Sequence, residues 1–302
     1  MKIRAEIEDR ILAGPFPPGF PRTAVFPDYE GFGITAIPSL IERILGLAEE
    51  GGPLDEAIGP LESERVILLI LDGLGYRKLS ELFAGDHDLA LKELGERGSF
   101  IPITSVFPAT TAAALTTYST GLPPAGHGII GYRLYLRETG AITNMIHLSL
   151  VGTGNDDTAI AAGLDPDKLL RQPTLYERLG SRGVATHTLL PRQISKSGLS
   201  KIFYRGSTAI HPTISFPDML VTARGILARA GGPTFLTLYW PSLDGVAHAR
   251  GPDSDAYLAE VLSIDGAIRR ELVGRIERTL IVVSSDHGFV PMEKSDYLSL
   301  SS

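Results

Sequence analysis

The stretch RVILLILDGLG, residues 65–75, decides the fold of this 302-residue chain. Six consecutive apolar residues follow Arg65, which is the pattern of a β-strand buried on both faces. Strands of this kind belong to parallel sheets that helices cover on both sides. Asp72 follows the apolar run directly, so the predicted strand delivers a carboxylate at its carboxyl end.

Four further segments have a similar character and are predicted to be strands. They are residues 101–106 (IPITSV), 183–190 (GVATHTLL), 234–240 (TFLTLYW) and 279–285 (TLIVVSS). Segments with helical periodicity lie between them, among them residues 37–50, 173–183 and 253–276. Strands that alternate with helices predict an α/β fold with a mainly parallel sheet.

Two regions depart from this alternation. Residues 1–33 contain many prolines and glycines, and we interpret them as an N-terminal arm on a main domain of residues 34–302. Residues 132–215 contain a predicted hairpin, which turns at residues 138–140, followed by a stretch rich in Gly, Thr, Ser and Pro. We interpret this region as insertions beside the sheet that form part of a smaller cap over a site.

The composition excludes several classes of function. The chain has 28 basic and 35 acidic residues, a net charge of −7, which does not suit a nucleic-acid polymer as the main partner. Cysteine is absent, so disulfides, thiolate metal sites and a Cys nucleophile are excluded. The first twenty residues lack the apolar stretch of a signal peptide, and no run approaches the length of a membrane span. We therefore expect a soluble, cytoplasmic protein with no membrane partner.

Side chains that carry chemistry follow four of the predicted strands. In chain order they are Asp72, the pair Thr110 and Thr111, Asp244 with His248, and the pair Asp286 and His287. In open parallel sheets, functional groups gather at the edge where the strands end, so we expect these side chains to meet. Each also has a structural explanation, because Asp caps turns, Thr caps helices, and residues four apart are neighbours on a helix.

Taken together, these groups favour phosphoryl transfer assisted by metal ions. Carboxylates and imidazoles suit Zn²⁺, or Mn²⁺, better than Ca²⁺. A helix that begins near Thr111 would offer N–H groups to a phosphoryl anion. Coordination to one metal would favour the alkoxide of a Thr, and a second metal would steady the leaving oxygen. The residues alone leave the structural explanations open.

Four motifs occur in the order found in one superfamily. They are LDGLG (71–75), VFPATTAAALTTYSTGLPPAGHGIIGYRLY (106–135), DGVAHARGP (244–252) and SSDHGF (284–289). The chain resembles the alkaline phosphatase superfamily, most closely its type I phosphodiesterase/nucleotide pyrophosphatase branch, from about residue 34 to 293. There the nucleophile motif reads F-P-x-x-T, which residues 107–111 match. The resemblance implies a three-layer α/β sandwich of the alkaline phosphatase type.

The resemblance also implies roles for particular residues. Thr111 corresponds to the nucleophile, and the reaction is expected to pass through a phospho-threonine intermediate. The first metal site is implied to consist of Asp72, Thr111, Asp286 and His287. The second is implied to contain Asp244 and His248. The implied cofactors are two divalent metals, usually zinc, and the implied reaction is hydrolysis of a phosphodiester or pyrophosphate bond in a small phosphorylated substrate such as a nucleotide.

Two features depart from the family pattern. Where many members have an Asn that contacts the phosphate, this chain has Tyr132, which we expect to bind substrate. Asn144 is a second candidate for that role, although it could instead stabilise the predicted hairpin. The third ligand of the second metal site is a His downstream of the Asp-His pair in the family, and no His follows His287 here. We therefore expect a shortened C-terminal end and a second metal that is weakly held or missing.

Two alternatives to the hydrolase with a full metal pair stay open. One is a catalytically impaired member of the superfamily that binds metal or phosphate. The other is a phosphomonoesterase or phosphotransferase of the same superfamily. The sequence does not predict the natural substrate or the oligomeric state.

Overall fold

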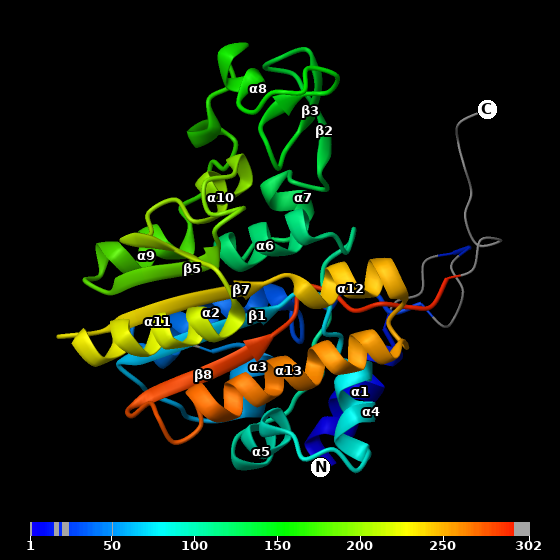
Figure 1. The fold of residues 1–302 in the computed structure, drawn as a ribbon, viewed down its shortest axis with the longest axis vertical. Helices are drawn as coiled ribbons and strands as arrows, with labels where there is room; N and C mark the ends of the chain where they lie inside the picture. The colour runs from blue at the N-terminus through cyan, green and yellow to red at the C-terminus, as the bar shows by residue number, and fades with distance from the viewer. Residues whose placement is uncertain (1, 15–17, 20–23, 50, 293–302) are drawn as a thin grey trace.

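A parallel sheet of five strands forms the centre of the computed structural model, which describes residues 2–14, 18–19, 24–49 and 51–292 (Figure 1). The strand order is β6-β5-β7-β1-β8. The strands are β1 (Arg65–Leu71), β5 (Ala185–Pro191), β6 (Ala209–Thr213), β7 (Thr234–Trp240) and β8 (Thr279–Ser284). Strands of the sheet pair in parallel, which confirms the predicted α/β fold class.

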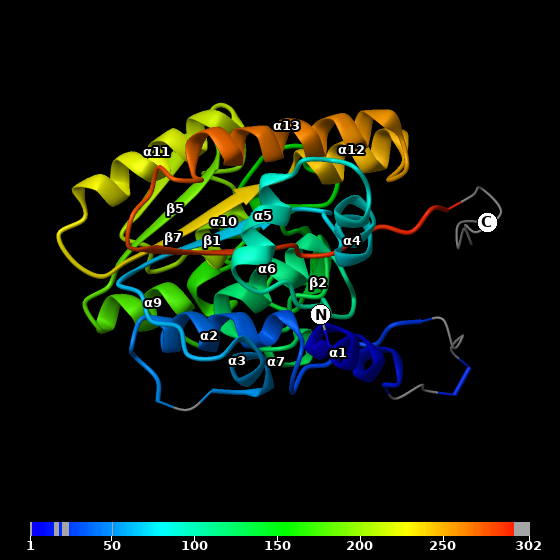
Figure 2. The same ribbon diagram turned by 90° about the horizontal axis from the view of Figure 1, so that it is seen from below.

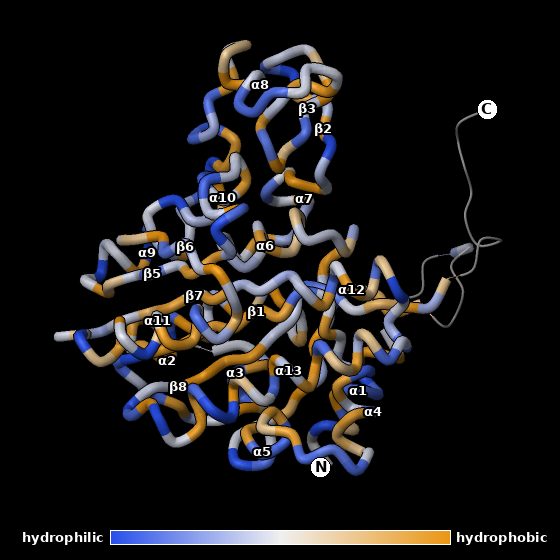
Figure 3. The backbone as a smooth tube through the Cα atoms, viewed as in Figure 1, coloured by the Kyte–Doolittle hydropathy of each residue, from blue (hydrophilic) through white to orange (hydrophobic). Residues whose placement is uncertain are grey.

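Strand β1 lies inside this sheet, between β7 and β8, as its apolar run predicts. Alternate side chains of β1 point to opposite faces, so each face receives three apolar residues. Val66, Leu68 and Ile70 join one hydrophobic core, and Ile67, Leu69 and Leu71 join another. Burying each such side chain stabilises the fold by about 1.5–3 kcal/mol. Hydrophobic residues accordingly run along the strands of the sheet, as on β8 (Figure 3).

Helices cover both faces of the sheet and complete a three-layer sandwich (Figure 2). The first face carries α1 (Lys2–Leu12), α2 (Ile37–Ile44), α3 (Pro53–Ile58), α6 (Thr111–Thr120), α9 (Leu175–Ser181) and α10 (Gly198–Phe203). The second face carries α4 (Tyr76–Ala84), α5 (Ala90–Arg97), α11 (Phe216–Arg229), α12 (Ser242–Arg250) and α13 (Asp255–Glu271). All ten residues of α6 are buried, because its small side chains let neighbouring elements approach from every side.

A second, antiparallel sheet projects from the sandwich (Figure 1). It consists of β2 (Arg133–Leu136), β3 (Ala141–Asn144) and β4 (Ser149–Leu150), and α8 (Thr158–Ala161) packs beside it. The predicted hairpin is confirmed, since β2 and β3 pair across a turn in which Gly140 has a φ of +63°. The span 132–215 therefore divides: its first part projects, whereas α9, β5 and β6 belong to the sandwich. The short elements η1 (Ile34–Ala36), α7 (Pro124–His127) and η2 (Pro166–Lys168) lie in the connections.

Two strand assignments needed correction. The predicted strand 101–106 is wrong, because only Thr104 forms an isolated parallel bridge, with Gly33. Pro102 has no N–H to offer to a sheet, which explains this result. The strand β6, which contains His211, is not among the predicted strands. Pro212 hides this strand in the sequence, but an edge strand tolerates a proline.

The N-terminal segment packs against the sandwich through α1. Ile7 is buried, and the Arg4 guanidinium donates hydrogen bonds to the Tyr76 hydroxyl at 2.7 Å and to Ser80 at 2.8 Å, both on α4. The same guanidinium lies over the Phe100 ring, 4.5 Å from its centre. The end of the chain, which we predicted to be shortened, lies outside the described residues at positions 293–302. Among the described helices, none has the length and apolarity needed to cross a bilayer.

Candidate active site

The carboxyl ends of three neighbouring strands bring the predicted residues together. Strand β1 pairs in register with β7 on one side and with β8 on the other, so the three strands end at the same edge. Asp72 follows β1, Asp244 lies in the first turn of α12 after β7, and Asp286 and His287 follow β8. The parallel topology that the sequence predicts is therefore what assembles this site.

The imidazole of His287 lies at the centre of the cluster. Its Nε2 atom is 3.5 Å from Oδ1 of Asp72, 3.6 Å from Oδ2 of Asp286 and 3.8 Å from Oδ1 of Asp244. Its Nδ1 atom faces the carbonyl oxygen of Gly288 at 3.2 Å. A carbonyl can only accept, so this contact is a hydrogen bond in the tautomer that carries its proton on Nδ1, and in that tautomer Nε2 has a lone pair on the side of the three carboxylates.

Each of the two buried carboxylates has one oxygen fixed by donors and one oxygen without a donor. Oδ1 of Asp286 accepts hydrogen bonds from the backbone N–H of Gly73 at 3.2 Å and of His287 at 2.9 Å. Oδ2 of Asp72 accepts a hydrogen bond from the Tyr239 hydroxyl. The other oxygens, Oδ1 of Asp72 and Oδ2 of Asp286, are buried and have no partner. A buried ionised oxygen without a partner is costly unless a cation lies beside it.

The electrostatics of Asp72 and Asp286 also indicate a site for a cation. Burial raises the pKa of the Asp72 carboxyl well above its ordinary value, and the charge of Asp286 raises it further. Burial also raises the pKa of Asp286, although the hydrogen bonds from two backbone N–H groups oppose this. Two carboxylates this close and this buried hold both negative charges readily only when a cation compensates them.

These residues fit a divalent metal ion. Ligand atoms of Asp72, Asp286 and His287 all lie within 4.8 Å of one another, and no other set of three His, Cys, Asp or Glu residues in the described part of the chain does so. Two carboxylate oxygens and an unprotonated imidazole nitrogen suit zinc or manganese.

Thr111 lies at the start of α6. Thr110 is the N-cap of this helix and accepts a hydrogen bond from the backbone N–H of Ala113 at 3.4 Å, so its structural explanation is confirmed. Thr111 is 8% exposed. Burial raises the pKa of the Tyr132 hydroxyl, the nearby Thr111 hydroxyl opposes this, and the charge of Asp72 adds to it. The Tyr132 hydroxyl is therefore close to the threonine and to the carboxylates.

Asp244 and His248 form a second, more open pair. They are four residues apart on α12, and Nε2 of His248 is 3.4 Å from Oδ1 of Asp244. The His248 side chain is 71% exposed, whereas that of His287 is 11% exposed. The Phe289 ring contacts both imidazoles edge to face, with ring centres 5.2 Å from His248 and 5.4 Å from His287. The aromatic ring thus lines the solvent side of the cluster.

Glycines let the two ligand loops pack against each other. Gly73 has a φ of +81°, and a Cβ there would lie 2.6 Å from the Phe289 ring. A Cβ on Gly75 would lie 2.7 Å from the Cα of Gly288. Tyr257 donates a hydrogen bond to the Gly73 carbonyl at 3.0 Å and fixes the first loop from the other side. The glycines of LDGLG and DHGF therefore reflect close backbone approach.

Three supporting residues were not identified from the sequence. Tyr239, on β7, donates to Asp72. Tyr118, on α6, donates to the carbonyl of Ser285 at 2.9 Å, and Ser105 donates to a carbonyl of the same loop. A signal was present, because buried tyrosines near the ends of apolar segments need hydrogen-bond partners. Their partners, however, are distant in sequence and could not be read from it.

Among the described residues, no hydrogen bond connects Asn144 with the carboxylates, the histidines or Thr111 of the cluster. It is the last residue of β3, and its Oδ1 accepts a hydrogen bond from the backbone N–H of Ile146 at 3.0 Å. This local bond supports the stabilising role in the hairpin. A role of Asn144 in substrate binding stays a prediction.

The other histidines of the motif region and of the sheet have local partners. His127 Nδ1 accepts from the N–H of Ile129 at 3.1 Å, and Nε2 faces the Thr117 hydroxyl at 3.2 Å. Burial lowers the pKa of His127 to about 4, so the ring is neutral near pH 7. At the opposite edge of the sheet from β8, Nδ1 of His187 lies 3.1 Å from Nε2 of His211.

Comparison with known proteins identifies the family. Residues 66–301 match the family model of type I phosphodiesterases/nucleotide pyrophosphatases. The chain belongs to this family, which confirms the predicted superfamily branch.

Individual relatives are more distant. The chain is 31% identical over 96 residues to bovine (Bos taurus) bis(5'-adenosyl)-triphosphatase ENPP4, a match that covers 30% of this chain and 21% of that protein. Murine ectonucleotide pyrophosphatase/phosphodiesterase 5, in an inactive form with AMP, superimposes with a TM-score of 0.57 at 18% identity over 76% of this chain and 59% of its own. Phosphonoacetate hydrolase from Sinorhizobium meliloti 1021 with phosphonoformate gives 0.55 at 23% identity, over 77% and 58%. The chain thus spans a fifth to three fifths of these relatives.

Proposed function

We propose that this protein is a metal-dependent hydrolase of phosphodiester or pyrophosphate bonds, with Thr111 as its nucleophile. One observation carries the proposal: the unpartnered oxygens of Asp72 and Asp286 lie 3.5 and 3.6 Å from Nε2 of His287 at the carboxyl edge of the sheet. The Tyr132 hydroxyl is close to these carboxylates and to Thr111. Membership of the phosphodiesterase/nucleotide pyrophosphatase family supports the same reaction.

The cluster divides into two proposed metal sites. Asp72, Asp286 and His287 would hold the first metal together with Thr111. Asp244 and His248 would hold the second. Zinc is the proposed metal, because the ligand set mixes carboxylates with imidazoles. When bound, the metals supply Lewis acidity, which favours the alkoxide of Thr111 and offsets charge on the phosphoryl oxygens.

The protein's own groups orient the reaction. Oγ1 of Thr111 gives up its proton to solvent and attacks phosphorus while the bond to the leaving oxygen breaks, which produces a phospho-threonine and releases the leaving group. Water then attacks the same phosphorus and releases Thr111. The N–H of Ala113 donates to Thr110, which leaves the backbone N–H groups of Thr111 and Ala112 at the start of α6 to donate to phosphoryl oxygens. Because its pKa is raised, Tyr132 stays protonated near pH 7 and can donate to a nonbridging oxygen.

Nucleotides are the proposed substrate class. The murine relative is known with AMP, and the bovine relative is named for a dinucleoside triphosphate. These are properties of those proteins. They support nucleotides as the first compounds to test.

A second candidate function is binding of metal or phosphate with little turnover. The exposure of His248 favours it, as does the lack of a third acidic or histidine ligand around Asp244 and His248 in the described part of the chain. A second metal held by two side chains would dissociate readily.

Hydrolysis of bis-p-nitrophenyl phosphate and of p-nitrophenyl phosphate tests the proposal. With Zn²⁺ present, the diester should be the better substrate, and Thr111→Ala should lower kcat by at least about 10³-fold. The control is Thr111→Ser, which keeps a hydroxyl and should retain part of the activity and a phosphorylated residue 111 detectable by mass spectrometry. Full activity in Thr111→Ala would refute the nucleophile. Zinc binding without turnover of either ester would favour the binding protein.

A further inference from the structure

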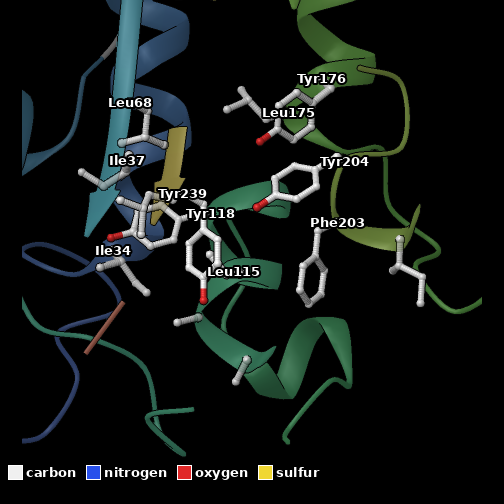
Figure 4. Close-up of a cluster of buried hydrophobic side chains, with 14 of the residues drawn as sticks. Ile34, Ile37, Leu68, Leu115, Tyr118, Leu175, Tyr176, Phe203, Tyr204 and Tyr239 are labelled. Carbon is white, nitrogen blue, oxygen red and sulfur yellow. The ribbon is translucent and has the colours of Figure 1, made fainter. Parts of the chain in front are cut away.

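Strand β7 holds Asp72 at two points. The backbone N–H of Asp72 donates to the carbonyl of Trp240 at 3.0 Å. Tyr239, which precedes Trp240 on β7, donates its hydroxyl hydrogen to Oδ2 of Asp72. Tyr239 is 5% exposed and lies in the cluster of buried side chains drawn in Figure 4. Packing therefore fixes the Tyr239 ring, and with it the position of the hydroxyl that donates to Asp72.

This contact decides which oxygen of Asp72 is available. Oδ2 is occupied by the phenol, so Oδ1 is the oxygen left to face His287, at 3.5 Å. Rotation of the carboxylate would break the bond to Tyr239 inside a closed core. The Asp286 carboxylate is restrained in a similar way. The backbone N–H groups of Gly73 and His287 donate to its Oδ1, and its Oδ2 has no partner.

We propose that Tyr239 is a positioning residue that fixes the Asp72 carboxylate so that Oδ1 alone is presented to the metal. The proposal rests on the metal site of the proposed function, and it assigns to Tyr239 a role in metal affinity. Hydrogen bonds to ligating carboxylates orient the ligand, and their loss commonly lowers metal affinity by about 10- to 100-fold.

A second tyrosine of the same cluster offers a matched control. Tyr176 is 3% exposed, and its hydroxyl donates to Oγ1 of Thr237, on the same strand, at 2.9 Å. Tyr176→Phe therefore removes a buried tyrosine hydrogen bond to β7 without touching a proposed metal ligand. If the loss of a buried hydrogen bond loosens this core and thereby lowers metal affinity, Tyr239→Phe and Tyr176→Phe should lose affinity to the same extent.

The test measures Zn²⁺ affinity, by competition with a chromophoric chelator, in metal-free full-length protein. Tyr239→Phe should bind Zn²⁺ about 10- to 100-fold more weakly than the unchanged protein, and Tyr176→Phe should stay within about twofold. In an Asp72→Asn background, adding Tyr239→Phe should change the affinity by less than about twofold, because the two residues act as one unit. At saturating Zn²⁺, kcat of Tyr239→Phe should largely recover.

Other outcomes separate this proposal from the function on which it rests. Equal affinity of Tyr239→Phe and the unchanged protein, or equal losses in the two tyrosine variants, overturns the positioning role but leaves the proposed hydrolase intact. An unchanged protein that binds no Zn²⁺ refutes the metal site and the positioning role together. If Tyr239→Phe does not fold, the variant that combines Tyr239→Phe with Asp72→Asn is the deciding measurement. If this double variant folds, the loss of folding in Tyr239→Phe comes from the unpaired Asp72 carboxylate, which supports the proposal. If neither variant folds, the proposal is overturned.

Discussion

Replacing Gly75 by Ala should disturb the cluster without changing any of its ligands. Gly75 has a φ of −67° and a ψ of 149°, values that alanine adopts easily, so backbone strain is not an issue. The new Cβ would instead lie 2.7 Å from the Cα of Gly288, where ordinary contacts begin at 3.4 Å. One loop must therefore move by about 0.7 Å, and His287 is the residue before Gly288.

A shift of this size is large for a metal ligand. Displacements near 1 Å can cost about 10²-fold in activity, and overpacking costs about 1–3 kcal/mol in stability. We expect Gly75→Ala to lower Zn²⁺ affinity at least about tenfold and to lower the unfolding free energy by about 1–3 kcal/mol. Chelator competition and urea denaturation measure the two quantities.

The matched control for this substitution is Gly180→Ala. Gly180 lies in α9 with nothing within 4 Å of its added Cβ, so alanine should stabilise the helix by about 0.5–1 kcal/mol and leave metal affinity unchanged. Zinc affinity in Gly75→Ala equal to that of the unchanged protein would show that the loops do not depend on this close approach.

Two further predictions concern stability. The pKa values of Asp72 and Asp286 are raised on folding, so above about pH 4 these two groups bind more protons in the folded metal-free protein than in the unfolded chain, and their contribution to stability should fall as the pH rises. The lowered pKa of His127 acts in the opposite direction, so the measurement is urea denaturation of the unchanged protein and of Asp72→Asn, each at pH 5 and pH 8. The change from pH 5 to pH 8 should be less unfavourable in Asp72→Asn, and an equal change in the two proteins would contradict the prediction. Arg205→Ala should cost about 1.5–3 kcal/mol, because Arg205 bonds to the partly exposed Glu177 at 2.9 Å and to three backbone carbonyls. Zinc affinity should not change in that variant, and a loss of affinity would show that the connection before α9 supports the metal cluster.

Much of the fold was predictable because its strands are buried on both faces. The apolar runs at β1 and β7 match the predicted strands residue for residue, since nothing in them conflicts with a strand. The errors were in segments with a proline: residues 101–106 were predicted to be a strand although Pro102 cannot donate to a sheet, and Pro212 hid β6. In both segments, whether a strand forms depends on which backbone N–H groups must pair with a neighbouring strand. That pairing is a property of the tertiary structure.

The cluster was predictable for a related reason. Asp72, Asp286 and His287 follow strands that a parallel sheet must end at one edge, so their meeting follows from topology. The contact from Tyr239 to Asp72 could not be predicted in this way, because it depends on the register of β7 against β1 and on a side-chain orientation.

The burial of α6 has a consequence for how the protein should lose function on heating. Peripheral helices fray and open independently, so groups mounted on them can be disabled well below the melting temperature. A helix with no solvent-facing side opens only when the surrounding core opens. The hydroxyl proposed as the nucleophile therefore belongs to the last cooperative unit to unfold, and catalytic competence and the folded core should disappear in a single transition.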